Sequence, residues 1–93
     1  MITLTAGEIG LLIGGELFCD KDLLVSKAPV FDSRKASPGC IFLALQGEVV
    51  DGHDFAADAY RAGAMFSITS RRIDGPCIVV ADVMEALSIL ATF

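Results

Sequence analysis

Residues 40–45 read Cys40-Ile41-Phe42-Leu43-Ala44-Leu45 and form the longest unbroken run of apolar side chains in the chain. From Ile41 onward no polar residue alternates with the apolar ones, a pattern typical of a strand buried on both faces at the centre of an α/β sheet. The turn-forming pair Pro38-Gly39 precedes the run, and a glycine-bounded loop, 47–52, follows it. We therefore predict a buried strand over 41–45 with a polar loop at each end.

Strand and helix patterns alternate on the C-terminal side of this run. Residues 54–62 predict a helix with Phe55, Ala59 and Ala62 on one side, an Asp58–Arg61 pair on its surface, and Gly63 just past its end. The segments that follow are a strand over 65–69, a turn at 74–76, a strand over 78–80 and a helix from the N-cap Asp82 to Phe93. This order places helices against a small, mixed, partly parallel sheet.

The N-terminal side begins with a helix signal. Thr5 and Glu8 have the spacing of a capping box, apolar residues repeat at helical spacing through Ile13, and the pair 14–15 is Gly-Gly, which stops a helix. Two further glycines, Gly7 and Gly10, weaken this helix. Short extended segments are then predicted over 16–19 and 25–31, separated by a turn at 20–22. The chain is predicted to be one α/β domain, 1–93, with about three helices.

The helix over 82–93 is apolar around most of its circumference. Its polar side chains are Glu85, Ser88 and Thr92, and no Gly, Asn or basic residue ends it before Phe93. A surface helix normally has a narrower apolar stripe. We therefore expect either a further domain or more chain to cover this helix, with packing into a dimer as the alternative.

Composition excludes several classes of protein. The 93 residues are 54% hydrophobic and 20% charged with a net charge of −5, which excludes intrinsic disorder and argues against nucleic-acid binding. No apolar run is long enough to cross a membrane, and no secretory signal is visible. The three cysteines have no metal-site spacing, so we expect a reduced, cytoplasmic chain with Cys19, Cys40 and Cys77 as core residues.

Motifs for catalysis are missing from the sequence. It contains no G-x-x-x-x-G-K-[ST] phosphate loop, no G-x-G-x-x-G and no G-x-S-x-G, and its single histidine cannot build a histidine-rich metal site. The length is also short for an enzyme that binds two substrates and a nucleotide. We expect no catalytic residue, no metal site and no cofactor in this chain, which should be inactive alone.

Two polar loops flank the apolar run and carry the candidate site. In the first, Asp32-Ser33-Arg34, the arginine and the hydroxyl could bind a phosphate, or the tripeptide could be a capped turn with a solvated arginine. The second, 47–55, opens a helix whose N-terminus attracts anions, yet Asp51 and Asp54 there could be helix caps instead. His53 could be a base or a surface residue.

These motifs, taken together at their fixed spacings, resemble the N-terminal domain of the bacterial Mur ligases. The matching stretches are Asp32-Ser33-Arg34, Pro38-Gly39 with Ile41 to Leu45, Gly47-Glu48, Asp51-Gly52-His53-Asp54-Phe55 and Ala62-Gly63-Ala64. The resemblance covers essentially the whole chain. Residues 2–17 are most similar to the branch of the family that adds D-alanyl-D-alanine, and 78–93 to the helix that leaves the domain.

The resemblance implies a role in peptidoglycan precursor synthesis. Such ligases use ATP and Mg²⁺ to join a UDP-N-acetylmuramoyl-peptide to D-alanyl-D-alanine through an acyl phosphate, and their first domain holds the UDP end of the substrate. It implies that Ser33 and Arg34 contact the uridine diphosphate. It also implies that Gly47, Glu48 and Val49 border the uracil, and it includes Asp32, Asp51, Gly52 and His53 as motif positions.

Two alternatives stay open. The same motifs fit the preceding ligase of the family, which adds the third peptide residue. A free-standing binding module that uses the apolar helix 82–93 as its interface would also fit. In the favoured interpretation the ATP site, the magnesium ligands and the dipeptide site belong to other domains, which would cover helix 82–93.

Overall fold

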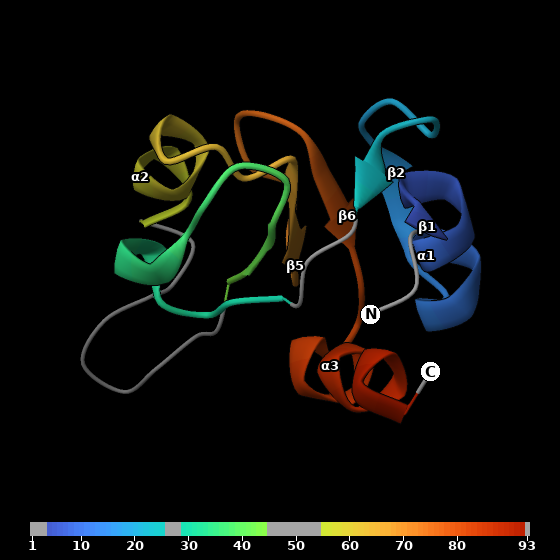
Figure 1. The fold of residues 1–93 in the computed structure, drawn as a ribbon. Coiled ribbons are helices and arrows are strands. Elements are labelled where there is room, and N and C mark those ends of the chain that lie inside the picture. Colours follow the sequence, from blue (N-terminus) through green and yellow to red (C-terminus); the bar gives the residue numbers. More distant parts are fainter. Residues whose placement is uncertain (1–3, 26–28, 45–54, 93) are drawn as a thin grey trace.

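The computed structural model describes residues 4–25, 29–44 and 55–92 (Figure 1). Six strands, three α-helices and a short 3₁₀ helix follow one another along these residues. In chain order they are β1 (Leu4–Thr5), α1 (Ala6–Ile13), β2 (Glu16–Phe18), β3 (Leu24–Val25), η1 (Ser33–Lys35), β4 (Ile41–Leu43), α2 (Ala56–Arg61), β5 (Phe66–Thr69), β6 (Cys77–Val79) and α3 (Val83–Thr92). The predicted α/β class is confirmed.

Four strands form a mixed sheet in the order β2-β6-β5-β4. The pairs β4–β5 and β5–β6 are parallel, with Ile41 opposite Phe66 and Ile68 opposite Ile78, whereas β2 runs antiparallel to β6. The strands β1 and β3 make a separate antiparallel pair. The two parallel pairs require crossover connections, and α2 supplies the one between β4 and β5.

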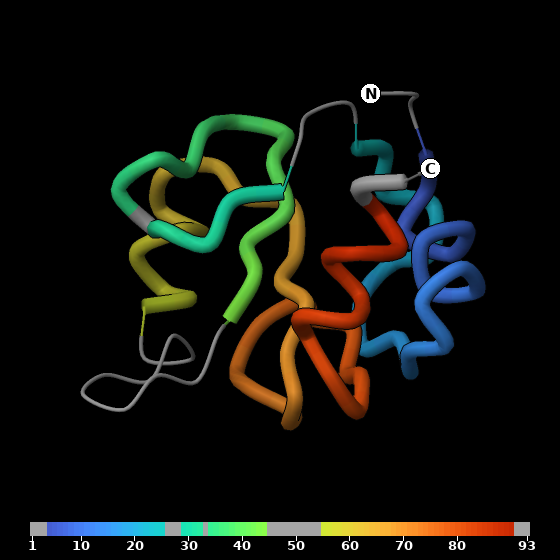
Figure 2. The backbone as a smooth tube through the Cα atoms, turned by 90° about the horizontal axis from the view of Figure 1, so that it is seen from below, coloured from blue at the N-terminus to red at the C-terminus, as the bar shows by residue number. Residues whose placement is uncertain are grey.

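Helices cover both faces of this sheet, which explains why the central run lacks polar alternation. In Figures 1 and 2, α2 lies on one side and α1 and α3 on the other. Ile41 and Leu43 belong to the larger core cluster with residues of α1 and α3, while Phe42 and Ala44 pack with Ala56 and Ala59 of α2. The predicted two-sided burial of 41–44 is therefore confirmed, and Leu45 lies outside the described residues.

The first helix begins and ends at its predicted signals. The Glu8 amide donates to Thr5 Oγ1 at 3.1 Å, and the Thr5 amide donates to Glu8 Oε1 at 3.0 Å, so both halves of the capping box form. Gly14 ends the helix in the left-handed conformation at φ 67°. Gly10, which weakens the helix locally, allows close packing, because a Cβ there would collide with the Leu17 side chain.

The second helix departs from its predicted boundaries and buried side. It spans Ala56–Arg61, and Phe55, predicted to share one side with Ala59, is 38% exposed. Phe55 precedes the first helical turn, so helical spacing does not set its direction. The buried residues are Ala56 and Ala59, whose small side chains let the helix approach the sheet closely. Gly63 follows the helix at φ 108°, and the Asp58–Arg61 ion pair forms as predicted.

The remaining predicted strands are present: two are shorter than predicted, and the third has the predicted length but is shifted by one residue. β2 ends at Phe18, β5 begins at Phe66 and β6 covers Cys77–Val79, each within one residue of the predicted span at either end. The extended segment over 25–31 is only partly regular: β3 ends at Val25, Val30 makes a single parallel bridge to Phe42, and 26–28 lie outside the described residues.

Asp82 caps the last helix as predicted. Its Oδ1 accepts from the Met84 amide at 2.9 Å and from the Glu85 amide at 3.2 Å. Val83, Ala86 and Leu90 face the core, and helix α3 packs against α1. Met84 is 57% exposed, so this helix presents apolar surface in the isolated chain. No described helix is long and apolar enough to cross a bilayer.

Two hydroxyls of β5 give a matched test of this packing. Ser67 Oγ donates to the Tyr60 hydroxyl at 2.9 Å, whereas the equally buried Thr69 Oγ1 has no partner within the described segments. Thr69→Val removes an unpaired hydroxyl with little change of shape, so we expect the free energy of unfolding to rise by about 1 kcal/mol. Ser67→Ala should lower it by about 1 kcal/mol.

Urea denaturation of the two variants and the parent chain measures both changes. A loss of stability in Thr69→Val as large as in Ser67→Ala would show that the Thr69 hydroxyl has a partner.

Candidate functional site

The first polar loop is joined to the sheet by backbone hydrogen bonds. The Val30 amide donates to the Ile41 carbonyl at 2.9 Å, and the Val30 carbonyl accepts from the Leu43 amide at 2.8 Å. The turn that begins at Asp32 therefore starts two residues beyond an anchored position on the edge of β4. Such anchoring holds a polar turn at a constant place on the surface.

Asp32 organises this turn with a single carboxylate. Its Oδ1 accepts from the Arg34 backbone amide at 2.9 Å and from Arg34 Nε at 3.1 Å, while Oδ2 accepts from Arg34 Nη2 at 2.9 Å. The Lys35 amide also donates to the Asp32 carbonyl at 2.9 Å, which closes the short helix η1. The Arg34 side chain is 88% exposed despite these bonds, and that of Asp32 is 26% exposed.

The electrostatics of the pair favour the charged state of both groups. Hydrogen bonds from the Arg34 side chain, and then from its backbone amide, lower the pKa of the Asp32 carboxyl to about 2. The same side-chain hydrogen bond, followed by the charge of Asp32, raises the pKa of the Arg34 guanidinium. The pair is therefore ionised throughout the physiological pH range.

The structure describes part of the predicted site. Asp32 and Arg34 lie together in the turn, with the backbone of Ser33 at the start of η1. The other predicted residues lie outside the described residues: Gly47, Glu48, Val49, Asp51, Gly52 and His53. The described residue before that loop in the sequence, Ala44, packs in the same apolar cluster as Ala36, which follows η1.

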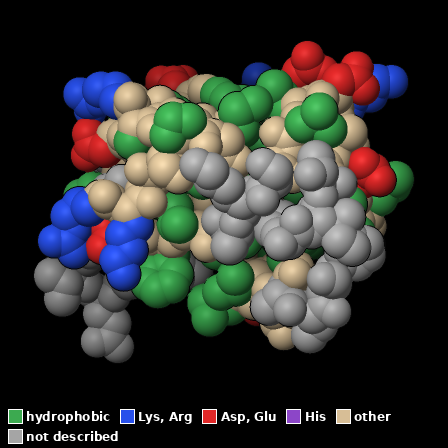
Figure 3. All heavy atoms as spheres, in the orientation of Figure 1, with side chains coloured by type: hydrophobic (Ala, Val, Ile, Leu, Met, Phe, Trp, Pro, Cys, Tyr) green, Lys and Arg blue, Asp and Glu red, His purple; other side chains and the backbone are tan. Residues whose placement is uncertain are grey.

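Phe31 is a candidate that the motif-based interpretation missed. It lies between the anchored Val30 and Asp32, and it is 64% exposed, which is unusual for a large aromatic side chain. In Figure 3 acidic and basic side chains gather over η1, and hydrophobic side chains adjoin them. The motifs gave no signal for Phe31, because its exposure depends on where the bridge between Val30 and Phe42 leaves the chain.

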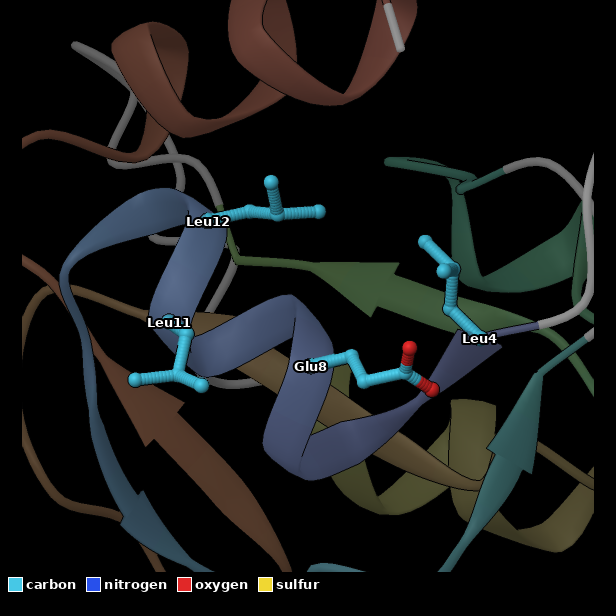
Figure 4. Close-up of a pocket in the computed structure, with 4 residues that line it drawn as sticks. All are labelled: Leu4, Glu8, Leu11 and Leu12. Carbon is cyan, nitrogen blue, oxygen red and sulfur yellow. The ribbon is translucent and has the colours of Figure 1, made fainter.

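A groove on α1 is a concave feature of the described residues. It has a volume of about 300 Å³ and is lined by Leu4, Glu8, Leu11 and Leu12 (Figure 4). Glu8 Oε1 already accepts from the Thr5 amide and hydroxyl in the capping box. The groove is therefore apolar with an engaged carboxylate, a poor site for an anionic ligand, and α1 lies across the molecule from η1 (Figure 1).

The cysteines are structural rather than reactive. Cys40 and Cys77 are buried, and Cys19 is half-buried. Burial, and then the charges of Cys77 and Asp20, raise the pKa of the Cys19 thiol, which disfavours the nucleophilic thiolate. Across the described segments, no group of three or more His, Cys, Asp and Glu side chains is arranged to hold a metal ion.

The pKa of Asp32 reports directly on the turn. We expect its carboxyl carbon to titrate near pH 2 by NMR, and Arg34→Ala to return the pKa toward 3.8, the value of an unperturbed aspartate. Because the folded-state pKa is the lower one, the pair stabilises the fold above about pH 4. This contribution is lost as the pH falls through 2. Titration of the unaltered protein near 3.8 would contradict the geometry.

Comparison with known proteins identifies the family. Residues 30–92 match the model described as "Mur ligase family, catalytic domain". UDP-N-acetylmuramoyl-tripeptide–D-alanyl-D-alanine ligases are similar over nearly the whole chain: the enzyme of Escherichia coli is 39% identical over 100% of this chain and 21% of its own length. The enzyme of Mycobacterium leprae is 41% identical over 87% of this chain and 17% of its own length.

Solved structures agree with the sequence comparison. The UDP-N-acetylmuramoylalanyl-D-glutamyl-2,6-diaminopimelate–D-alanyl-D-alanyl ligase of Acinetobacter baumannii superposes with a TM-score of 0.84 at 33% identity, over 97% of this chain and 21% of that structure. The MurF ligase of Thermotoga maritima superposes with a TM-score of 0.66 at 32% identity, over 77% of this chain and 17% of that structure. The chain spans about a fifth of the length of these relatives. It belongs to the Mur ligase family.

Proposed function

We propose that this chain, residues 1–93, is the N-terminal domain of a Mur ligase and binds the UDP end of a UDP-N-acetylmuramoyl-peptide. The ligase would add D-alanyl-D-alanine, the second substrate in the names of its relatives. We assign this step to the cytoplasmic synthesis of peptidoglycan precursors. The observation that carries the proposal is the exposed Arg34 guanidinium, which Asp32 orders at the edge of the sheet.

The turn matches the chemistry of a nucleoside diphosphate. A guanidinium binds phosphate through paired N–H donors, and the Nη1 side of Arg34 has no acceptor within the described segments. The exposed ring of Phe31, three residues before Arg34, offers a surface on which a nucleobase can stack. Ser33 completes this group as a phosphate contact, while Gly47, Glu48 and Val49 border the uracil.

The remaining motif residues are assigned to the border of the same site. Asp51, Gly52 and His53 follow that loop and lie at the start of the segment that leads into α2. Their role as ligand contacts competes with a role as caps of the chain entering the helix.

Ligation itself is assigned to the rest of the ligase. ATP and Mg²⁺ would supply phosphoryl transfer to the substrate carboxyl, but the described residues contain no carboxylate cluster for the metal and the sequence has no phosphate loop. We therefore assign substrate binding to this chain and derive no chemical step from its residues. The other ligase domains, with the D-alanyl-D-alanine site, would cover the apolar surface of α3.

The extent of the match separates two candidate ligases. A UDP-N-acetylmuramoyl-L-alanyl-D-glutamate–2,6-diaminopimelate ligase from Listeria monocytogenes is 44% identical but over only 67% of this chain. The D-alanyl-D-alanine ligases of E. coli and M. leprae match 100% and 87% of it. This wider match favours D-alanyl-D-alanine as the second substrate. A free-standing module that uses α3 as its interface would leave the UDP site without a ligand.

Titration with UDP-N-acetylmuramoyl-tripeptide tests the proposal. We expect chemical-shift changes at the backbone amides of residues 33, 34, 47 and 48. Arg34→Ala should weaken binding by about ten- to a hundredfold, because a charge-assisted phosphate contact is worth about 1.5–3 kcal/mol. Phe31→Ala should weaken it about fivefold or more through lost stacking.

Arg61→Ala is the matched control for these variants. Arg61 is also an exposed arginine paired with a nearby aspartate, but it lies on α2. The affinity of the Arg61→Ala variant for UDP-N-acetylmuramoyl-tripeptide should equal that of the parent chain. If millimolar ligand moves none of the four amides, or if Arg61→Ala weakens binding as much as Arg34→Ala, the site is wrongly assigned.

ATP binding independently tests whether the ATP site lies outside this chain. The proposed assignment predicts no saturable ATP binding by this chain in isothermal titration calorimetry, with or without Mg²⁺. Saturable binding at a site other than the turn at 32–35 would place part of the ATP site in this chain.

A further inference from the structure

Both oxygens of the Asp32 carboxylate accept hydrogen bonds inside its own turn. Its two oxygens accept from three nitrogen atoms of Arg34, the backbone N, Nε and Nη2. The i, i+2 spacing allows the bond from the Arg34 backbone amide to Asp32. The two bonds from Arg34 Nε and Nη2 to the carboxylate, here called the fork, fold the guanidinium back over the same turn. These bonds occupy three of the about four acceptor sites of the carboxylate, so they leave about one for any other donor.

The fork leaves a defined part of the guanidinium available. It uses the edge between Nε and Nη2, so the Nη1 side of the planar group points away from Asp32. The Arg34 side chain is 88% exposed, so that side faces solvent. An exposed arginine side chain normally samples many rotamers. If it is already held in one geometry, it loses less conformational entropy when the ligand binds.

We propose that Asp32 is a positioning residue, which holds the Arg34 guanidinium with its Nη1 side outward to receive the diphosphate of the substrate. Asp32 itself does not contact the nucleotide. This assignment rests on the proposed function, since it requires that Arg34 binds phosphate. It also changes the role of Asp32 from a motif position at the site border to a group that acts through Arg34.

Positioning and simple electrostatics predict opposite signs for removal of the Asp32 charge. A carboxylate beside an arginine lowers the local positive potential, so its neutralisation alone should strengthen the binding of an anion. If Asp32 positions Arg34, neutralisation should weaken binding, because the guanidinium loses its fixed geometry. The direction of the change therefore identifies the role.

Asp32→Asn is the test variant, because the amide oxygen can still accept from the Arg34 backbone and keep the turn. Asp58→Asn is the matched control: it removes the same charge from another exposed Asp–Arg pair, on α2. With UDP as the probe at constant ionic strength, we expect Asp32→Asn to weaken binding five- to tenfold and Asp58→Asn to change it less than twofold. Uridine, which lacks phosphates, should bind both variants and the parent equally.

Arg34→Lys separates positioning from a general structural role. Lysine keeps the charge but cannot form the fork, so Asp32→Asn should have no further effect on UDP affinity in the Arg34→Lys background. Additive losses in the double variant, or unchanged or tighter UDP binding by Asp32→Asn, would overturn the positioning role. If Asp32→Asn fails to fold, Asp32→Ser, which keeps an oxygen acceptor for the turn, takes its place with the same expected loss.

Failure of the proposed function has a different signature. If the parent chain binds no UDP while its Arg34 Nε–H proton shows slow exchange by NMR, the fork exists but has no phosphate to receive. That result overturns both assignments. Normal UDP binding by the parent, unaffected in Asp32→Asn, overturns the positioning role alone.

Discussion

The pairing of β4 with a neighbour on each side is the constraint on which the rest of the structure depends. On one side it pairs in parallel with β5, Ile41 opposite Phe66, and on the other the Val30 backbone bonds to Ile41 and Leu43. Parallel strands of this kind are stable only when both faces are covered. The helices α1 and α3 cover one face and α2 the other, so the arrangement of every helix follows from the burial of this strand.

The same pairing brings the candidate site to the sheet edge. Val30 lies between the core strand and Phe31, and the turn of Asp32 and Arg34 follows directly. Rigid strands with polar turns at their ends are a common arrangement for binding sites, because the strand supplies position and the turn supplies chemistry. In this chain the supporting strand is among the most buried parts, whereas the arginine is among the most exposed.

Sequence patterns predicted the features that depend on local chemistry. The capping box at Thr5 and Glu8, the left-handed Gly14 and the N-cap Asp82 form because neighbouring residues determine them. The unbroken apolar run predicted burial on both faces. Features set by tertiary packing could not be predicted in this way. Helical spacing misplaced Phe55, since it precedes the helix, and nothing local showed that Gly10 permits the approach of Leu17.

The candidate site was partly predictable for the same reason. The motif indicates the turn. From the sequence, Asp32-Ser33-Arg34 fits both a capped turn and a phosphate-binding site. The structure shows that the turn is capped by Asp32 and that the same carboxylate also holds the arginine. Capping and an outward-facing guanidinium are thus compatible. The fork between Asp32 and Arg34 depends on side-chain torsions, which the spacing of residues in the sequence does not determine. The exposure of Phe31 depends on the bridge between Val30 and Phe42.

A paramagnetic probe on the ligand tests the central claim, that the turn of η1 receives a nucleoside diphosphate. Mn²⁺ bound to the diphosphate of UDP broadens NMR signals of nearby protons, and Mn²⁺ with uridine controls for binding of the free ion. We expect selective broadening of the Arg34 and Lys35 amides. The amides of α1, across the molecule from η1 in Figure 1, should stay sharp. Broadening centred on α1, or equal broadening with uridine, would contradict it.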